Sequence, residues 1–156
     1  MWLPAIIIMI VIFYFSAQPA EESADLSGGL SYHLVTMVKN MFGLEWNQEE
    51  VLLISERLDY PVRKMAHLTE YALLGISVAF GLAYGTERFV RLSKENVRRL
   101  CFETQRIGSL YAVSDEIHQL FVPGRAGMVG DVLIDSVGVL VGFGVFIGLK
   151  QFFGRS

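Results

Sequence analysis

The chain has 156 residues, enough for one domain of ordinary size. Hydrophobic residues make up 53% and charged residues only 19%, and the mean hydropathy is +0.44, which lies outside the range typical of soluble proteins. The net charge of -3 comes without a basic patch for nucleic acid, and a single cysteine excludes an internal disulfide or a cysteine-based zinc motif. We therefore expect an integral membrane protein that does not bind nucleic acid.

The first predicted span covers residues 2–18. Trp2 to Phe15 is almost uninterruptedly apolar, with Pro4 in the first helical turn, where a missing N–H does little harm. At about 1.5 Å per residue this run is short for a hydrocarbon core about 30 Å thick, so we expect residues 16–18 to extend it. No basic residue precedes it and residues 16–19 make a poor cleavage site, so we expect a retained helix.

Residues 19–60 form a more polar segment that opens with acidic and small residues. Apolar residues recur at helical spacing in 34–42 and 51–58, and Asn47-Gln48-Glu49-Glu50 is typical of a capped helix start. We expect short amphipathic helices here, which either lie on the membrane surface or cover the bundle.

A second span is predicted over residues 61–84, with Asp59 or Tyr60 as its cap and Pro61 in its first turn. The following segment, 85–106, holds six of the 13 basic residues: Arg88, Arg91, Lys94, Arg98, Arg99 and Arg106. The positive-inside rule makes this segment cytoplasmic. Both chain termini are then cytoplasmic, and residues 19–60 lie outside.

The third predicted span, 107–122, has polar residues inside an apolar run, and Pro123-Gly124-Arg125 turns the chain after it. The fourth span, 131–149, has Asp131, Asp135, Gly138 and Gly142 on one stripe. Glycines let another helix backbone approach closely, and Gly144 and Gly148 are further candidates for this role. The predicted fold is thus an all-α bundle of four transmembrane helices.

Ionisable residues from three of these helices fall in the same outer half of the membrane. Positions 63, 67 and 70 share one face of the second span, since residues three and four apart on a helix are neighbours. An ionisable group at membrane depth costs a few kcal/mol or more, so its default interpretation is functional. We expect a pocket that opens outward between the second, third and fourth spans.

Four motifs, in order along nearly the whole chain, carry a family resemblance. They are Phe15-Ser16-Ala17-Gln18, Arg63-Lys64-x-x-His67-x-x-Glu70-Tyr71, Tyr111-Ala112-x-x-Asp115-Glu116-x-His118-Gln119-x-Phe121-Val122-Pro123-Gly124-Arg125, and Asp131-x-x-x-Asp135-x-x-Gly138-x-x-x-Gly142. Together they resemble the VanZ-like family. The resemblance implies a single domain over residues 1–156, in a multi-pass protein of the bacterial cytoplasmic membrane.

The founding member of that family confers low-level resistance to teicoplanin, a lipid-tailed glycopeptide antibiotic. Relatives occur in many bacteria without glycopeptide-resistance clusters, so an ordinary role in the cell envelope is an equally good expectation.

One hypothesis is an enzyme that acts on a lipid-linked phosphate or pyrophosphate, or on a cell-wall precursor. Histidine suits proton transfer near neutral pH, and arginine binds anionic groups as a bidentate fork. The candidate catalytic residues are His67, Glu70, Asp115, Glu116 and His118. The candidate substrate-binding residues are Arg63, Lys64, Tyr71, Gln119, Arg125, Asp131 and Asp135. A divalent metal ion is a candidate cofactor, with His67, Asp115, His118 and Asp131 as candidate ligands, although no HExxH motif is present.

Two other interpretations stay open. The same groups suit a protein that binds a membrane lipid, a lipid-linked envelope precursor or the antibiotic without turnover. They also suit a structural network of buried ion pairs, Arg125 with Asp131 and Lys64 with Glu70 or Asp115, which would fix the register of the helices.

Overall fold

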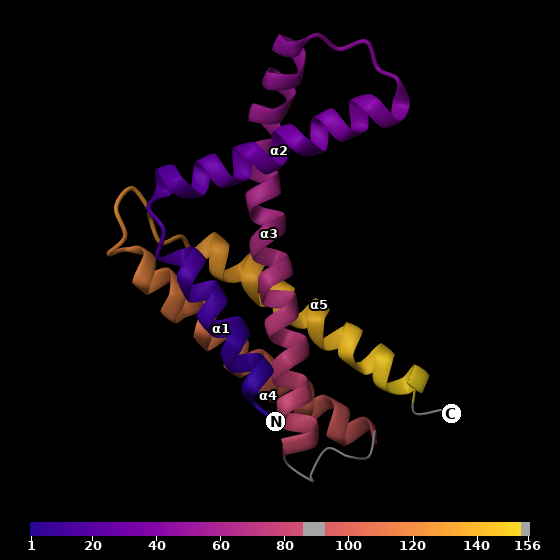
Figure 1. Cartoon of the computed structure of the whole chain (residues 1–156). Coiled ribbons are helices and arrows are strands. Elements are labelled where there is room, and N and C mark those ends of the chain that lie inside the picture. Colours follow the sequence, from indigo (N-terminus) through magenta and orange to yellow (C-terminus); the bar gives the residue numbers. More distant parts are fainter. Residues whose placement is uncertain (86–92, 154–156) are drawn as a thin grey trace.

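The structure, a computed structural model, describes residues 1–85 and 93–153. These residues are all-helical, which confirms the predicted class. The helices are α1 (Leu3–Ser16), α2 (Ala20–Phe42), α3 (Gln48–Gly85), α4 (Lys94–Gln119) and α5 (Val129–Phe153). Figure 1 shows α3 as the long axis of the molecule, with α2 lying across its N-terminal part and α1, α4 and α5 packed around the rest.

A sharp corner separates α1 from α2. The sequence predicts that the first helix reaches Gln18, whereas α1 ends at Ser16. Proline disfavours helical backbone in the residue before it and lacks an N–H, so Pro19 ends the first helix and caps the next. The two helices meet at 105°, which directs α2 away from the bundle and across α3.

Helix α2 is one helix of 23 residues rather than a short amphipathic segment. Its buried positions include Ser31 and Val35, and the helix packs against α3. Gly43 ends the helix with φ of 63° and donates its N–H to the carbonyl of Lys39, a left-handed cap that glycine adopts without strain. Its exposed apolar side chains include Leu26, Leu30, Leu34, Met37 and Met41.

Helix α3 begins at Gln48, so the predicted start at Pro61 is wrong, as is the cap at Asp59 or Tyr60. The capping motif at Asn47 is confirmed: its Oδ1 accepts the Glu50 N–H at 2.9 Å, and its own N–H donates to Glu50 Oε2 at 2.7 Å. Pro61 removes one backbone hydrogen bond from the helix interior. Helix α2 packs against α3 and crosses its N-terminal part (Figure 1).

Helix α4 begins at Lys94, well before the predicted residue 107. Ser93 caps it by accepting the Asn96 N–H on Oγ at 3.1 Å. Of the basic residues predicted to form a cytoplasmic loop, Arg88 and Arg91 lie outside the described residues. Lys94, Arg98, Arg99 and Arg106 lie on α4.

Helix α5 packs closely on α3 through its glycines. A Cβ atom on Gly138 would lie 2.6 Å from the Leu68 carbonyl oxygen, and one on Gly142 would overlap the carbonyl of Ala72. Cβ atoms on Gly144 and Gly148 would meet nothing within 4 Å. The prediction of close helix packing is therefore confirmed for Gly138 and Gly142 and wrong for Gly144 and Gly148.

The hydropathy pattern is that of a membrane protein. Among the described residues, α3 and α5 are each long and apolar enough to cross a membrane, and α1 with α2 pass the same test as one bent pair. The structure thus supports two or three spans on this criterion. A shared core, which includes Ala5, Tyr71, Ala112 and Val139, joins α1, α3, α4 and α5.

Candidate functional site

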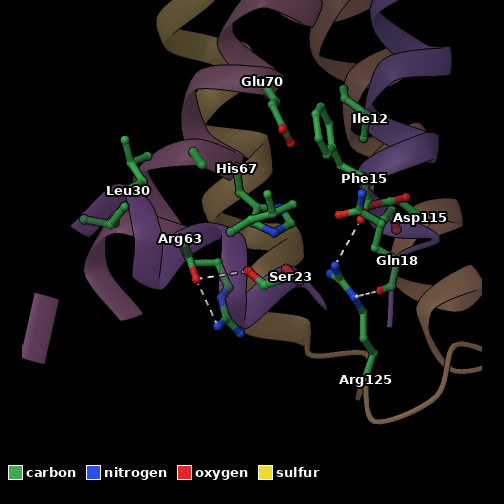
Figure 2. Close-up of a pocket in the computed structure, with 15 residues that line it drawn as sticks. Ile12, Phe15, Gln18, Ser23, Leu30, Arg63, His67, Glu70, Asp115 and Arg125 are labelled. Atoms are coloured by element: carbon green, nitrogen blue, oxygen red, sulfur yellow. Dashed lines mark hydrogen bonds between the residues drawn. The ribbon is translucent and has the colours of Figure 1, made fainter. Parts of the chain in front are cut away.

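A cavity of about 270 Å³ lies where the α1–α2 corner meets the N-terminal half of α3. Figure 2 shows that it gathers side chains from four helices and from the turn after α4. The predicted pocket lay between α3, α4 and α5, whereas this cavity lies between α1, α2 and α3 and is closed by one residue of α4. Its lining is Ile12, Phe15, Ser16, Gln18, Ser23, Leu26, Ser27, Leu30, Val62, Arg63, Ala66, His67, Glu70, Asp115 and Arg125.

Five of the predicted site residues meet in this cavity. Arg63, His67 and Glu70 come from successive turns of one face of α3, as the spacing predicts. Asp115 joins them from α4 and is only 3% exposed, and Arg125 comes from the turn after α4. The cavity therefore holds two guanidinium groups, an imidazole and two carboxyl groups.

Arg63 is held in place by groups from two helices. One of its terminal nitrogens, Nη2, lies 3.1 Å from Asp59 Oδ2 on α3 and 3.2 Å from Ser27 Oγ on α2. Its Nε is buried without a hydrogen-bond partner among the described residues. A buried donor without a partner is costly, so one edge of the cavity carries an unmet hydrogen-bonding group.

Arg125 binds the end of α1 instead of a carboxylate. Its Nε donates to the Gln18 carbonyl at 2.8 Å, and its Nη2 donates to the Phe15 carbonyl at 3.0 Å. The last carbonyls of a helix lack intrahelical partners and carry partial negative charge, so a guanidinium stabilises them. Figure 2 shows both bonds at the edge of the cavity.

Neighbouring charges surround the Arg125 guanidinium. Partial burial lowers its pKa, and nearby Arg63 lowers it further, while Asp115, Glu116 and Glu70 raise it. Arginine titrates so far above neutrality that the group keeps its charge. The positive charge at this edge of the cavity is therefore permanent.

A buried carboxyl group lies behind the cavity. Asp135 on α5 is fully buried, and its Oδ1 lies 3.9 Å from Nδ1 of His67. Neither of its oxygens, nor His67 Nδ1, has a hydrogen-bond partner among the described residues. His67 thus has the cavity on one side and a buried carboxyl group on the other.

The remaining predicted site residues lie outside the cavity. Tyr71 is buried in the core, and the ring of His118 packs against Phe13 with centroids 4.5 Å apart. Gln119 Nε2 donates to Asp115 Oδ2 at 3.3 Å, and Glu116 Oε2 accepts the Met128 N–H at 2.7 Å. None of these four lines this cavity.

The predicted structural ion pairs are wrong in their partners. Lys64 pairs with Asp131, not with Glu70 or Asp115. Arg125, predicted to pair with Asp131, binds the backbone of α1.

Sequence reasoning missed the part that α1 and α2 play in the cavity. Ser23 and Ser27 line it from α2, and Gln18 lines it from the corner. Two signals were present: the Phe15-Ser16-Ala17-Gln18 motif, and two serines four residues apart, which would lie on one helix face. The second signal does not reveal which helix the serines would face.

The metal candidates are not gathered. Within residues 1–85 and 93–153, no group of three or more His, Cys, Asp or Glu side chains is arranged to hold a metal ion. In particular, His118 and Asp131 do not line the cavity that contains His67 and Asp115.

Comparisons with known proteins give one match. No curated protein and no solved structure matches the chain. The family model described as VanZ/LLP1 matches residues 1–151, which is nearly the whole chain. The chain therefore belongs to the VanZ/LLP1 family, which confirms the resemblance drawn from its motifs and makes it a VanZ-like membrane protein of the cell envelope.

Proposed function

We propose that this protein spans the bacterial cytoplasmic membrane four times, through α1, α3, α4 and α5. Helix α4 is not among the described helices that pass a test of length and hydropathy for crossing a membrane. In its C-terminal half Asp115 and Glu116 are buried, whereas Leu110 and Ile117 are exposed, so the outer face of that half is apolar. Its exposed charged residues Glu95, Arg99 and Arg106 lie in the N-terminal half, which we place at the cytoplasmic side.

The cavity faces the outside in this proposal. The N-terminal end of α1 and the C-terminal ends of α3 and α5 lie on the same side of the molecule (Figure 1). The basic residues at the start of α4 follow α3 on that side, and the positive-inside rule makes it cytoplasmic. The α1–α2 corner and the cavity lie toward the opposite, outer side, and α2 lies along the membrane surface.

The function that this site supports best is binding of a lipid-linked phosphate, followed by acid–base chemistry on it. The observation that carries the proposal is the pair of arginines at one small cavity, where Arg63 Nε is buried and unpaired among the described residues. A guanidinium fork matches the geometry of a phosphate, and its charge offsets that of the anion. His67, Glu70 and Asp115 lie in the same cavity.

The proposed reaction is hydrolysis of the phosphate ester or anhydride. The oxygen of water bonds to phosphorus, the bond from phosphorus to the leaving oxygen breaks, and one proton passes from water to the leaving group. His67 is the residue suited to carry that proton, because imidazole exchanges protons near neutral pH. Asp135 Oδ1 lies 3.9 Å from Nδ1 of this ring, beyond hydrogen-bonding distance, and we assign it a positioning role through packing beside the imidazole.

Turnover in detergent tests this proposal. The purified protein is incubated with polyprenyl phosphate, polyprenyl pyrophosphate and extracted lipid-linked wall precursors, with and without a chelator. His67→Ala and Asp115→Asn should each lower turnover about 10²–10⁴-fold, the range typical of acid–base groups. Glu95→Gln, which changes an exposed acid on α4, the helix of Asp115, should leave turnover unchanged. Absence of product from every substrate would reject catalysis.

A second candidate is a binding protein that holds the same lipid phosphate without turnover. It is favoured by the lack of a hydrogen-bonded acid–base pair among the described cavity residues, since His67 Nδ1 and Asp115 Oδ1 both lack partners. Its signature is saturable binding of polyprenyl phosphate that Arg63→Ala abolishes, with no product formed.

Both candidate functions are compatible with the family's link to teicoplanin. A protein that changes the lipid-linked precursors at the cell surface changes the targets available to a lipid-tailed glycopeptide. Expression in a susceptible host should raise the inhibitory concentration of teicoplanin, and Arg63→Ala should remove the increase. If the Arg63→Ala variant raises the inhibitory concentration as much as wild type does, the cavity is not the cause of resistance.

A further inference from the structure

A second hollow lies beside the cavity, between α2 and α3. It has a volume of about 520 Å³, and we call it the groove. The groove and the cavity share four lining residues, Leu30, Val62, Ala66 and Glu70, so the two lie next to each other. In Figure 2, Leu30 lies on the side of the cavity opposite Asp115 and Arg125. The groove is lined by Leu30, Leu34, Leu58, Pro61, Val62, Met65, Ala66, Thr69 and Glu70.

The groove and the cavity differ sharply in polarity. The cavity holds two arginines, a histidine and two acids, whereas Glu70, at the junction, is the single ionisable residue of the groove lining. The hydroxyl of Thr69 donates to the carbonyl of Met65 at 2.7 Å, so it is satisfied within α3. The groove therefore offers hydrocarbon contacts and few free polar groups.

The apolar wall of the groove is open to the surroundings of the protein. Leu34 and Leu58 are each 39% exposed, and Met65 is 60% exposed. In a membrane protein, apolar side chains exposed near the bilayer meet lipid chains instead of water. A hydrocarbon chain in the groove would therefore be in contact with the bilayer.

The volume of the cavity limits what its polar part can hold. Ligand sites in proteins commonly measure about 300–1,000 Å³, so a cavity of about 270 Å³ is at the small end. That space suits a phosphate or pyrophosphate group. It does not suit the sugar and peptide head group of a complete wall precursor.

We propose that the groove binds the hydrocarbon chain of a lipid whose phosphate or pyrophosphate head group occupies the cavity. The lipid enters sideways from the bilayer between α2 and α3. This inference rests on the proposed function, because the chain in the groove belongs to the same lipid whose head group the cavity binds. It narrows the substrate class to lipids with a small anionic head group.

Binding of two alkyl phosphates to the purified full-length protein tests the inference. The chain of hexadecyl phosphate is long enough to occupy the groove, whereas the four-carbon chain of butyl phosphate is too short to fill it. Met65→Trp fills the groove from α3, and Leu34→Trp fills it from α2. The matched control is Met41→Trp, which changes a methionine of similar exposure, 65% against 60%, that lines neither space.

Each methylene buried in the groove should raise the affinity about fourfold, so displacing only two should lower it more than tenfold. We expect this loss for hexadecyl phosphate with both groove variants. Butyl phosphate should bind equally to wild type and variants, and Met41→Trp should change neither probe. All variants are compared in one detergent, so partition of the probe into micelles cancels between them.

The outcomes separate this inference from the proposed function. If Arg63→Ala weakens both probes but the groove variants leave hexadecyl phosphate unchanged, the groove inference fails and phosphate binding stands. If neither probe binds wild type, or if Arg63→Ala changes neither, both proposals fail. Equal loss of both probes in the groove variants would show damage to the cavity itself and would also overturn the inference.

Discussion

The glycines of α5 give a matched test of how α3 and α5 are packed. A methyl group on Gly142 would overlap the main-chain carbonyl of Ala72, which cannot rotate away as a side chain can. A methyl group on Gly144, half a turn further along the same helix, would meet nothing within 4 Å. The two substitutions to alanine therefore differ in their contacts but hardly at all in their chemistry.

The expected energies have opposite signs. Alanine is better than glycine in a helix interior by about 1 kcal/mol, so Gly144→Ala should stabilise the protein by up to about that amount. Forcing an extra carbon into a packed seam costs about 1–3 kcal/mol, and a rigid backbone neighbour favours the upper end. After the helical gain is subtracted, Gly142→Ala should destabilise the protein by about 2 kcal/mol.

Unfolding in mixed detergent micelles, followed by circular dichroism, measures both variants against wild type. Gly148→Ala, which also faces open space, serves as a second control and should behave like Gly144→Ala. Equal stability of the Gly142→Ala and Gly144→Ala variants would refute the close approach of the two helices.

The close contact between α3 and α5 also sets the distance between His67 and Asp135. Gly138 touches the carbonyl of Leu68, the residue after His67, and Asp135 lies one turn before Gly138 on α5. A wider seam would move the buried carboxyl group away from the imidazole, which now lies 3.9 Å from it. Gly138→Ala should therefore lower turnover as well as stability, whereas Gly144→Ala should leave turnover unchanged.

Three further predictions concern polar contacts. Asn47→Ala removes the cap of α3 and should cost about 0.5–2 kcal/mol of stability in the same unfolding assay. Gln48→Ala, which changes the exposed next residue and leaves the capping bonds in place, is the comparison. Lys64→Met or Asp131→Asn alone should destabilise the protein more than the two substitutions together, because each single change leaves a half-buried charge unpaired. If the two losses of stability simply add in the double variant, the residues are not coupled. Arg125→Gln should loosen the end of α1, seen as faster amide hydrogen exchange near Phe15, while Arg99→Gln, which breaks an exposed pair, should not.

Local signals in the sequence predicted the parts of the fold that depend on neighbouring residues. The cap at Asn47 and the common face of Arg63, His67 and Glu70 follow from spacing alone. The start of α3 could not be predicted in this way. Proline is common in the first turn of a helix, so the sequence placed that first turn at Pro61. The same residue is tolerated inside a helix when a neighbouring element, here α2, packs against it.

The partners of charged residues were harder to predict, because many of them are backbone atoms. Reasoning from side chains assigned Arg125 to Asp131, but Arg125 binds the carbonyls of Phe15 and Gln18. Those acceptors exist only because α1 ends where it does. A sequence pattern contains no direct sign that a distant side chain will bind the carbonyls at a helix end.

The α1–α2 corner is thus the feature on which the cavity depends. Pro19 ends α1 and sends α2 across α3, which brings Ser27 within reach of Arg63. The same corner exposes the carbonyls that hold Arg125, and the Ala20 N–H donates to the Pro123 carbonyl at 3.1 Å, which fixes the turn after α4 against the start of α2. Without the bend, α3 would still carry its histidine and acids on one face. Arg63 would then lose its bond to Ser27 and Arg125 its bonds to the end of α1, and the cavity would lose the wall through which we propose that the lipid enters.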